Sequence, residues 1–449
     1  MRFRKVTTVV TLATAATLVA AGCSSSKSGG GGGAAKSDSA ACKKYADYQG
    51  NSGQKVNMYA SITDPEGGFL KQSWKEFESC TGITIQYTGD KEFETQLKIK
   101  VEGGNAPDIA IMPQPGLLAT FAKTGKLKPA SAKVKALASK NWAASWIGYG
   151  SYNGQFYGAP MGSNAKSLVW YSPKAFKAKN YTVPTTWDEM ISLSDKIVAD
   201  GQKPWCAGIE SGTATGWTAT DWMEEVMLRL YGPDVYKQWY THEIPFNDQK
   251  VQDVLAKVGQ IWKNDKYVNA GIGNVKSIAT TAFAKAGLPL ATGKCWMHQQ
   301  ASFYGANWPK GKTIGPDGDI YAFYEPAINS QFPKPVEGGA EFVTAFSDKP
   351  AVQAVQLYLA SADWATSRAK VHPGWTSANK NVDKTVYTDP VDKLSVDILT
   401  DPKAVIGFDA SDLMPSSVGT GSFWKQMTQW VLGQNDKATL DNVENSWPK

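Results

Sequence analysis

Aromatic rings and carboxylates are the side chains of this chain whose types and placement indicate chemistry. The sequence contains 17 Trp, 18 Tyr and 16 Phe among 449 residues. An aromatic ring offers a large apolar surface at low rotamer cost, so it can stack on an apolar face of a ligand. Carboxylates and amides bind hydroxyl groups, and buried pairs of this kind reject a ligand with the wrong hydroxyl geometry. The candidates on chemistry and placement are Glu66, Trp217, Asp221, Trp222, Trp375 and Asp409.

The three candidate tryptophans differ in their local sequence. Trp217 and Trp222 follow a helical spacing that packing in a core would equally explain. Trp375 lies in the loop-like stretch His-Pro-Gly-Trp-Thr, and this setting favours a role in binding. We therefore leave core packing open for Trp217 and Trp222.

The candidate carboxylates also have structural interpretations. Asp221 would suit the solvated face of a helix, and Glu66 would suit a turn or a helix cap. Asp409 lies between two apolar residues and fits a binding site or a structural position equally.

Enzyme motifs are missing from the sequence. It contains no Gly-x-Ser-x-Gly, His-Glu-x-x-His, Walker loop or dinucleotide Gly-x-Gly-x-x-Gly. Its three histidines, His242, His298 and His372, are too scattered to indicate a metal site. A secreted glycosidase would use similar aromatic residues with two carboxylates about 5–10 Å apart, and it is the alternative among enzymes. We expect a binding protein without a cofactor or metal.

The N-terminal residues indicate export. A basic start is followed by an apolar stretch and by small residues before Cys23, as in a secretory signal. The stretch Val19–Cys23 resembles a bacterial lipobox, with Ala20 where that motif most often has Leu. The resemblance implies a signal peptide over residues 1–22, a lipid on Cys23, and a flexible tether over 23–41. A transmembrane anchor is the alternative, but the segment is too short and too rich in Thr.

Charge and length restrict the function further. Without residues 1–22 the chain has 44 basic and 41 acidic residues, a net charge of +3, which argues against nucleic-acid binding. No later run reaches the ~18 apolar residues of a spanning helix. Just over 400 residues exceed what one core usually holds, so two lobes are expected.

Four cysteines remain once Cys23 is assigned to lipidation. In an exported chain they suggest two disulfides, for which three pairings are possible. We favour Cys42–Cys80 and Cys206–Cys295, because each bridge then stays within one segment. Free structural thiols are the alternative.

The start of the body alternates strands and helices. Strands are predicted at 56–60, 83–87 and 107–112, with amphipathic helices at 69–78 and 93–101 between them. This order favours a parallel sheet with helices on its faces, in which ligands bind at the carboxyl ends of the strands. The residues expected near that rim are Asp64, Glu66, Asp90 and Gln114.

The second region is also mixed. We predict a strand at 167–171, helices at 215–231 and 251–262, and a helix followed by a strand within 276–292. Thr186 and Glu189 have the spacing of a capping box at the start of another helix.

Several motifs occur together in a familiar order. They are Trp74–Glu78, the turn and strand Gly104–Asp108, Gly154–Pro160, and Pro184–Glu189. With the lipobox, they resemble the extracellular solute-binding proteins of carbohydrate ABC importers, the broad group of the maltose-binding protein. The stretch Pro204–Gly212 and its downstream tryptophans are most similar to the α-glucoside-binding branch.

The resemblance implies a hinged α/β fold with two lobes and a ligand between them. The first lobe would comprise about 55–162 and 322–365, and the second about 163–321 and 366–449. Sugar would bind the closed form better than the open form and shift the population toward it.

The resemblance also assigns residues by motif position. Gln114 and Asn164 stand where the maltose site has carboxylates, so both positions are amides here. Phe303 stands where a stacking Trp is expected, and Trp424 matches another stacking Trp. A disaccharide-type site that differs from the maltose site is therefore expected.

The implied ligand is an α-glucoside such as trehalose, maltose or sucrose. The implied partners are two permease subunits and their ATPases, with a monomeric receptor held outside the cytoplasmic membrane by its lipid alone. The alternative ligands are another oligosaccharide or a polyol. The alternative class of protein is an adhesive surface lipoprotein. A phosphosugar would require Arg or Lys at the rim, and the candidates are acidic, amide and aromatic.

Overall fold

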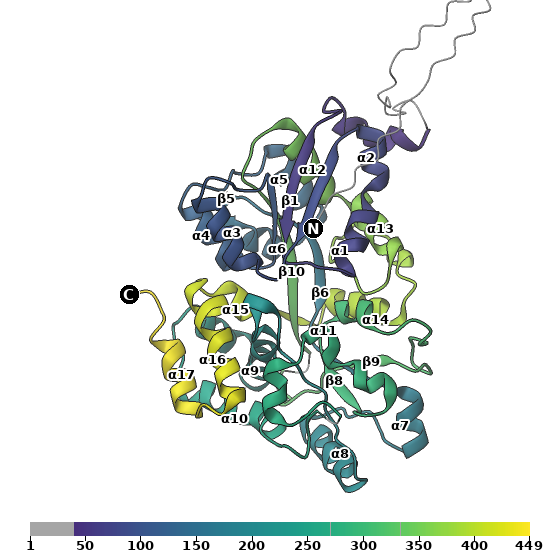
Figure 1. Cartoon of the computed structure of the whole chain (residues 1–449), viewed down its shortest axis with the longest axis vertical. Coiled ribbons are helices and arrows are strands. Elements are labelled where there is room, and N and C mark those ends of the chain that lie inside the picture. The colour runs from purple at the N-terminus through teal and green to yellow at the C-terminus, as the bar shows by residue number, and fades with distance from the viewer. Residues whose placement is uncertain (1–39, 270, 333) are drawn as a thin grey trace, which may run out of the picture. The chain divides into compact units, whose positions relative to one another are not determined.

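The computed structural model describes residues 40–449 except 270 and 333 (Figure 1). The predicted signal peptide, Cys23 and most of the predicted tether lie outside the described residues. The last two tether residues instead begin the 3-10 helix η1 (Ala40–Tyr48). Within the described part, no helix combines the length and the apolar character that a membrane span requires.

The predicted parallel strand and helix motif is present at the start of the body. Strand β1 pairs in parallel with both β2 and β3, as expected. The helix predicted between β1 and β2 is two helices that meet at Trp74, and the second ends at Gly82, whose φ of 71° suits glycine. The elements are β1 (Lys55–Ala60), α1 (Glu66–Ser73), α2 (Lys75–Thr81), β2 (Thr84–Gly89), α3 (Phe93–Glu102) and β3 (Ile109–Met112).

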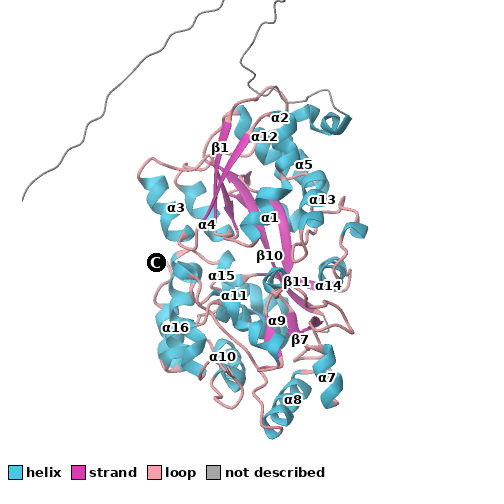
Figure 2. Cartoon of the chain, turned by 45° about the vertical axis from the view of Figure 1, so that its right-hand side comes forward, coloured by secondary structure: helices cyan, strands magenta, loops and turns pink. Residues whose placement is uncertain are grey.

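A long strand completes this sheet. β10 (Pro335–Ala345) pairs with β11 (Val405–Phe408) through its first residues and with β3 through its last residues. Its other edge pairs with β6 (Ala159–Ala165), so the sheet has six strands. Figure 2 shows β10 running between the region of β1 and the region of β7.

A second sheet has three strands. β7 (Leu168–Tyr171), predicted from the sequence, pairs with β8 (Met297–Gln299) and β9 (Tyr321–Tyr324). The prediction of a strand within 276–292 is wrong, because that stretch forms three short helices and the strand comes later, at β8. These helices are η3 (Val275–Thr280), α11 (Phe283–Ala286) and η4 (Leu288–Thr292).

Helix α9 (Trp217–Tyr240) is the long helix beside the small sheet. It is interrupted at Gly232–Pro233, where the predicted helix ends, because Pro233 lacks the N–H of a helix interior. Helix α8 (Trp187–Ala199) begins with the predicted capping box of Thr186 and Glu189.

The remaining elements surround the two sheets. The helices before β6 are α4 (Pro115–Lys123), α5 (Ala132–Asn141) and α6 (Ala144–Tyr149), followed by the hairpin β4 (Ser151–Tyr152) and β5 (Gln155–Phe156). Later helices are α7 (Pro173–Lys179), α10 (Gln249–Trp262), α12 (Pro350–Leu359), α13 (Ala362–Val371), α14 (Pro390–Thr400), α15 (Ala410–Leu413), α16 (Trp424–Leu432) and α17 (Asp436–Glu444). Short turns of 3-10 or π helix are η2 (Gly212–Ala214), η5 (Ser302–Asn307), η6 (Lys384–Val386) and η7 (Ser417–Phe423).

Two packing observations bear on the predicted boundaries between the lobes. The predicted boundary assigns residues 322 onward to the first lobe, yet β9 pairs within the small sheet. It assigns residues after 365 to the second lobe, yet Val382, Tyr387 and Val396 belong to the core that contains β1. The lobe boundaries remain a prediction, and this packing favours crossings later in the chain.

Both favoured disulfides are present. Cys42 is bonded to Cys80, which joins η1 to α2, and Cys206 is bonded to Cys295. The predicted pairing is confirmed, and the thiols of these four cysteines are not free.

Candidate functional site

A cavity of about 480 Å³ lies where elements of the two sheets meet. This volume is within the usual range for small-molecule pockets. Its lining comes from widely separated parts of the sequence, including the connection after β1, strands β6 and β10, and helices α9, α11, α13 and α16. Eight of the ten predicted ligand-binding residues line it, namely Glu66, Gln114, Asn164, Trp217, Phe303, Trp375, Asp409 and Trp424.

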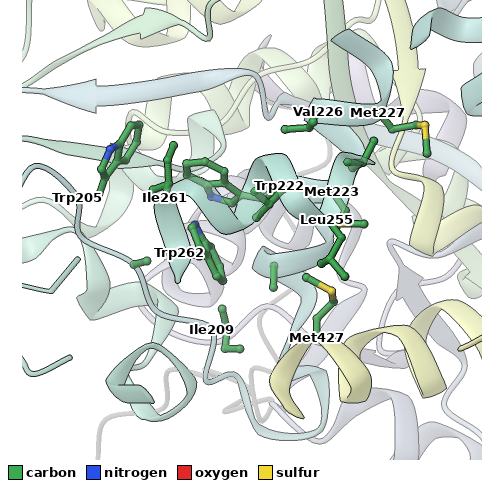
Figure 3. Close-up of a cluster of buried hydrophobic side chains, with 14 of the residues drawn as sticks. Trp205, Ile209, Trp222, Met223, Val226, Met227, Leu255, Ile261, Trp262 and Met427 are labelled. Atoms are coloured by element: carbon green, nitrogen blue, oxygen red, sulfur yellow. The ribbon is translucent and has the colours of Figure 1, made fainter. Parts of the chain in front are cut away.

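Trp222 is not at the cavity, and its prediction is corrected. Its ring packs edge-on against Trp205 and Trp262, with centroids 5.3 and 5.6 Å away (Figure 3). The side chain is 3% exposed and belongs to the core around α9. Trp222 therefore packs in the core, as its helical spacing also allowed, whereas Trp217 lines the cavity.

Asp221 is also absent from the lining. It is buried behind the cavity wall, where its carboxylate accepts a hydrogen bond from Lys166 Nζ at 2.7 Å. The solvated helix face considered for it is excluded as well. Of the rim residues expected from the sheet, Asp90 instead accepts a hydrogen bond from the Tyr59 hydroxyl at 2.5 Å.

One part of the cavity is aromatic. The Trp217 ring lies 5.2 Å from Phe283 and 6.0 Å from Phe303, between ring centroids. Trp424 is fixed by a hydrogen bond from its Nε1 to Ser411 Oγ at 3.2 Å. These rings come from α9, α11, η5 and α16, and together they offer an apolar surface to a ligand.

Another part of the cavity carries a buried arginine, on which the charges of Glu66, Asp392 and Glu341 act. Arg368 is 1% exposed, and its guanidinium lies 5.7 Å from the Trp375 ring. Burial raises the pKa of Glu66 to about 7, although the charge of Arg368 opposes the shift. Burial likewise raises the pKa of Glu341 to about 7. Burial lowers the pKa of Arg368 to about 10, against the attraction of Glu66.

Glu341 and Trp375 both lie close to Gly162 of β6. A Cβ on Gly162 would lie 2.6 Å from Glu341 Oε2 and 2.7 Å from Trp375 Nε1. Strand β6 therefore leaves space for both side chains only because residue 162 has no side chain.

Buried acceptor atoms of two amides and one carboxylate belong to residues that line the cavity. Gln114 Nε2 donates to Glu94 Oε1 at 3.0 Å. Among the described residues, Gln114 Oε1, Glu94 Oε2 and Asn164 Oδ1 have no hydrogen-bond partner. Because buried polar atoms are normally paired, these acceptors suit a ligand rich in hydroxyl donors.

Sequence reasoning missed Arg368, Glu341 and Glu94. Glu341 stands within the apolar strand β10 and Arg368 within a helix, and both are charged residues at sheltered positions. Their charge within an otherwise apolar stretch was the sequence feature that could have identified them as site residues, because a charged side chain is rarely buried without a partner or a function.

Three neighbouring carboxylates, which could in principle hold a metal ion, surround the ammonium group of a lysine instead. Atoms of Asp221, Glu337 and Asp409 lie within 4.8 Å of one another, a separation that a metal ion could bridge. Lys166 Nζ donates hydrogen bonds to the carboxylates of Asp221 and Asp409 and lies 3.5 Å from Glu337 Oε1. The ammonium group therefore supplies the positive charge that this cluster requires.

Known proteins resemble this chain over most of its length. A family model described as a bacterial extracellular solute-binding protein matches residues 60–369. An osmoprotective compounds-binding protein of Synechocystis sp. is 37% identical over 383 residues, covering 85% of this chain and 89% of that protein. An alpha-glucosides-binding periplasmic protein of Rhizobium meliloti is 35% identical over 410 residues, covering 88% and 87%.

Solved structures resemble the fold. The bacterial solute receptor AcbH, described as having an exclusive preference for β-D-galactopyranose, matches with a TM-score of 0.74 at 20% identity. The match covers 88% of this chain and 97% of the receptor. At this identity the likeness concerns the fold alone, and it confirms the predicted two-lobe α/β architecture.

Proposed function

The chain belongs to the bacterial extracellular solute-binding proteins, and we propose that its ligand is an α-glucoside, such as trehalose, maltose or sucrose, destined for a sugar ABC importer. One observation carries the proposal. A single cavity combines aromatic rings with half-buried carboxylates, a buried arginine and amide oxygens that have no hydrogen-bond partner among the described residues. Rings suit the CH face of a pyranose, and the polar groups suit its hydroxyls.

The α-glucoside class is supported by one relative in particular. The protein of Rhizobium meliloti is named for α-glucosides, and it is similar to this chain over nearly its whole length. A cavity of about 480 Å³ fits a disaccharide-sized ligand better than a long oligosaccharide.

The two buried cations at the cavity offer little free charge to a phosphosugar. Lys166 is hydrogen-bonded to two carboxylates, and the charges of Glu66, Asp392 and Glu341 act on Arg368. The other two cations of the lining, Lys91 and Lys285, are exposed, so a phosphate would have to compete with water for them.

The chain is a binding protein and not an enzyme, as its relatives are. Its family works outside the cytoplasm. We further propose that Cys23 carries a lipid that holds the body at the outer face of the cytoplasmic membrane. The sugar-loaded monomer would then deliver its ligand to a two-subunit permease powered by ATPases.

Contacts between elements of the two lobes are consistent with binding by closure. Thr213 Oγ1 donates to the Lys91 carbonyl at 3.2 Å, and Thr120 Oγ1 lies 3.3 Å from Ser416 Oγ. A sugar in the cavity would add its own hydrogen bonds to both lobes. Ligand that contacts both sides shifts the population toward the closed form.

Calorimetry and thermal unfolding with trehalose, maltose, sucrose, xylobiose and a galactoside test the proposal. Sugar at ~1,000 times its Kd should raise the free energy of unfolding by about 4 kcal/mol. Stabilisation by one α-glucoside, with intact sugar recovered, is the expected result. Stabilisation by the galactoside or xylobiose alone would refute the α-glucoside class, and recovery of cleaved sugar would refute the non-catalytic role.

A further inference from the structure

Three connections between the large sheet and the elements around α9 each carry a buried ionisable side chain. Lys166 stands between β6 and β7, Glu337 lies near the start of β10, and Asp409 directly follows β11. All three are at most 5% exposed. Any movement of one lobe against the other must bend these connections, so their side chains lie at the hinge.

These side chains contact one another and Asp221 of α9. Lys166 Nζ donates to Asp221 Oδ1 at 2.7 Å and to Asp409 Oδ2, and it lies 3.5 Å from Glu337 Oε1. One ammonium group thus faces three carboxylates. We call Lys166, Asp221, Glu337 and Asp409 the hinge network.

The buried cation of α9, Arg229, is paired with another carboxylate and is not free to pair with Glu337. Glu224 accepts hydrogen bonds from the backbone N–H groups of Ala410 and Ser411, and Glu225 is ion-paired with Arg229. Arg229 is therefore already engaged. The ionisable groups of α9 that act on Glu337 are Asp221, Glu224, Glu225, Arg229 and Tyr236.

Glu337 is the member of the network with the weakest partners. It is 0% exposed, and neither carboxylate oxygen has a hydrogen-bond partner among the described residues. A carboxylate charge without hydrogen-bond donors in such a place is unfavourable, whereas taking up a proton removes the charge. Accordingly, burial and the nearby charge of Asp221 raise the pKa of Glu337 well above its ordinary value, although Lys166 opposes the shift.

We propose that Glu337 is a proton-binding site of the hinge, which holds a proton in the conformation described here and releases it when the lobes separate. Separation would bring water to the network from the cavity side, where Lys166 and Asp409 already line the wall. Hydration favours the ionised carboxylate. The inference rests on the proposed function, because it requires that sugar closes the lobes.

The direction of the pH effect follows from linkage. Closing raises the proton affinity of Glu337, so sugar binding takes up protons between the open-form and closed-form pKa values. The affinity for sugar is then highest at low pH and falls as the pH rises through that window. One fully linked proton changes the affinity by up to about tenfold per pH unit.

Calorimetry on the full processed protein tests this linkage. The probe is whichever of trehalose, maltose and sucrose gives the largest thermal shift, titrated in buffers of different ionisation enthalpy. We expect proton uptake on binding in the unaltered protein and in Glu102→Gln, whose exposed side chain lies outside the network. Glu337→Gln mimics the protonated side chain, so it should bind sugar with clearly less proton uptake and a flatter dependence on pH.

Infrared spectroscopy of the sugar-saturated protein gives a second readout. A protonated carboxylic acid has a C=O stretch that a carboxylate lacks, and Glu337→Gln should lose one component of that band. Equal proton uptake in Glu337→Gln and the unaltered protein would overturn the inference. If Glu337→Gln does not fold, sugar binding by the unaltered protein without any proton uptake overturns it. Absence of binding by any α-glucoside would instead refute the proposed function.

Discussion

The two sides of the cavity have different chemistry. The polar wall consists of Glu66, Gln114, Glu341 and Arg368, with Trp375 beside the arginine. The aromatic wall consists of Trp217, Phe283, Phe303 and Trp424. The polar wall comes from elements around the large sheet, and the aromatic wall comes from elements around the small sheet and the C-terminal helices.

This difference separates affinity from selectivity. Stacked rings contribute buried apolar area that most pyranoses can provide, so the aromatic wall supplies binding energy with little discrimination. Buried polar groups are left unpaired by a sugar with the wrong hydroxyl geometry, so the polar wall discriminates between epimers. Closure brings the two walls onto one ligand, which makes both contributions available only in the closed form.

Removing the arginine from the polar wall should have the largest effect. In Arg368→Met the volume is nearly kept, but Glu66 and Glu341 lose the favourable charge of the guanidinium. Leaving two sheltered carboxylates without compensating charge should cost ~3–5 kcal/mol in the free energy of unfolding. Denaturant unfolding measures the loss, and sugar affinity should fall as well.

The pH dependence of the stability loss in Arg368→Met tests whether the loss comes from the charge of the arginine. Both carboxyls have a pKa of about 7, so below about pH 5 they are neutral and need no cation. The destabilisation by Arg368→Met should therefore be much smaller at about pH 5 than at about pH 8. An equal loss at both values would mean that Arg368 stabilises the protein by packing and not by its charge.

Two tryptophans on one helix distinguish the site from the core. Trp222→Ala should lower the free energy of unfolding by ~3–5 kcal/mol, since it leaves a cavity between Trp205 and Trp262. Sugar affinity of the folded protein should stay unchanged. Trp217→Ala, five residues earlier, should show the reverse pattern, and a shared loss of affinity would return Trp222 to the site.

The regular elements near the N-terminus of the body were predictable because local sequence determines them. Alternating apolar residues specified β1 and β2, and the capping box of Thr186 and Glu189 specified the start of α8. The stretch 276–292 was not predictable, because its short helices are too brief for a period to show.

The site was predictable only in part because helical spacing does not tell which face meets the ligand. Trp217 and Trp222 share a helix, and only the tertiary packing sends one to the cavity and the other to the core. Arg368 and Glu341 are distant in sequence from Glu66, so their meeting depends on how α1, α13 and β10 pack. Asp221 was selected for its type, but its partner Lys166 could not be identified before the fold was known.

A smaller effect is expected from the aromatic wall. Trp424→Ala should weaken sugar binding by ~1–3 kcal/mol, the value of a buried stacking ring, with selectivity among α-glucosides unchanged. Titration calorimetry measures both. A matched polar-wall variant, Gln114→Leu, should instead change the ranking of sugars, because it removes an acceptor and a donor. A change of ranking in Trp424→Ala would show that the aromatic wall also discriminates.

The last effect is the pH dependence of stability from the polar wall. The folded-state pKa of Glu66 and of Glu341 is raised above the unfolded value, so their stabilising contribution is complete below the unfolded pKa and is lost as the pH rises through about 7. Each carboxyl should contribute about 2–3 kcal/mol, since a shift of one pKa unit is worth about 1.4 kcal/mol. Thermal unfolding from about pH 5 to about pH 8 should show a smaller loss in Glu66→Gln than in the exposed control Glu102→Gln. Equal losses would mean that Glu66 stays ionised beside Arg368, and the polar wall would then bind sugar with a fixed charge and not with a neutral hydrogen-bond donor.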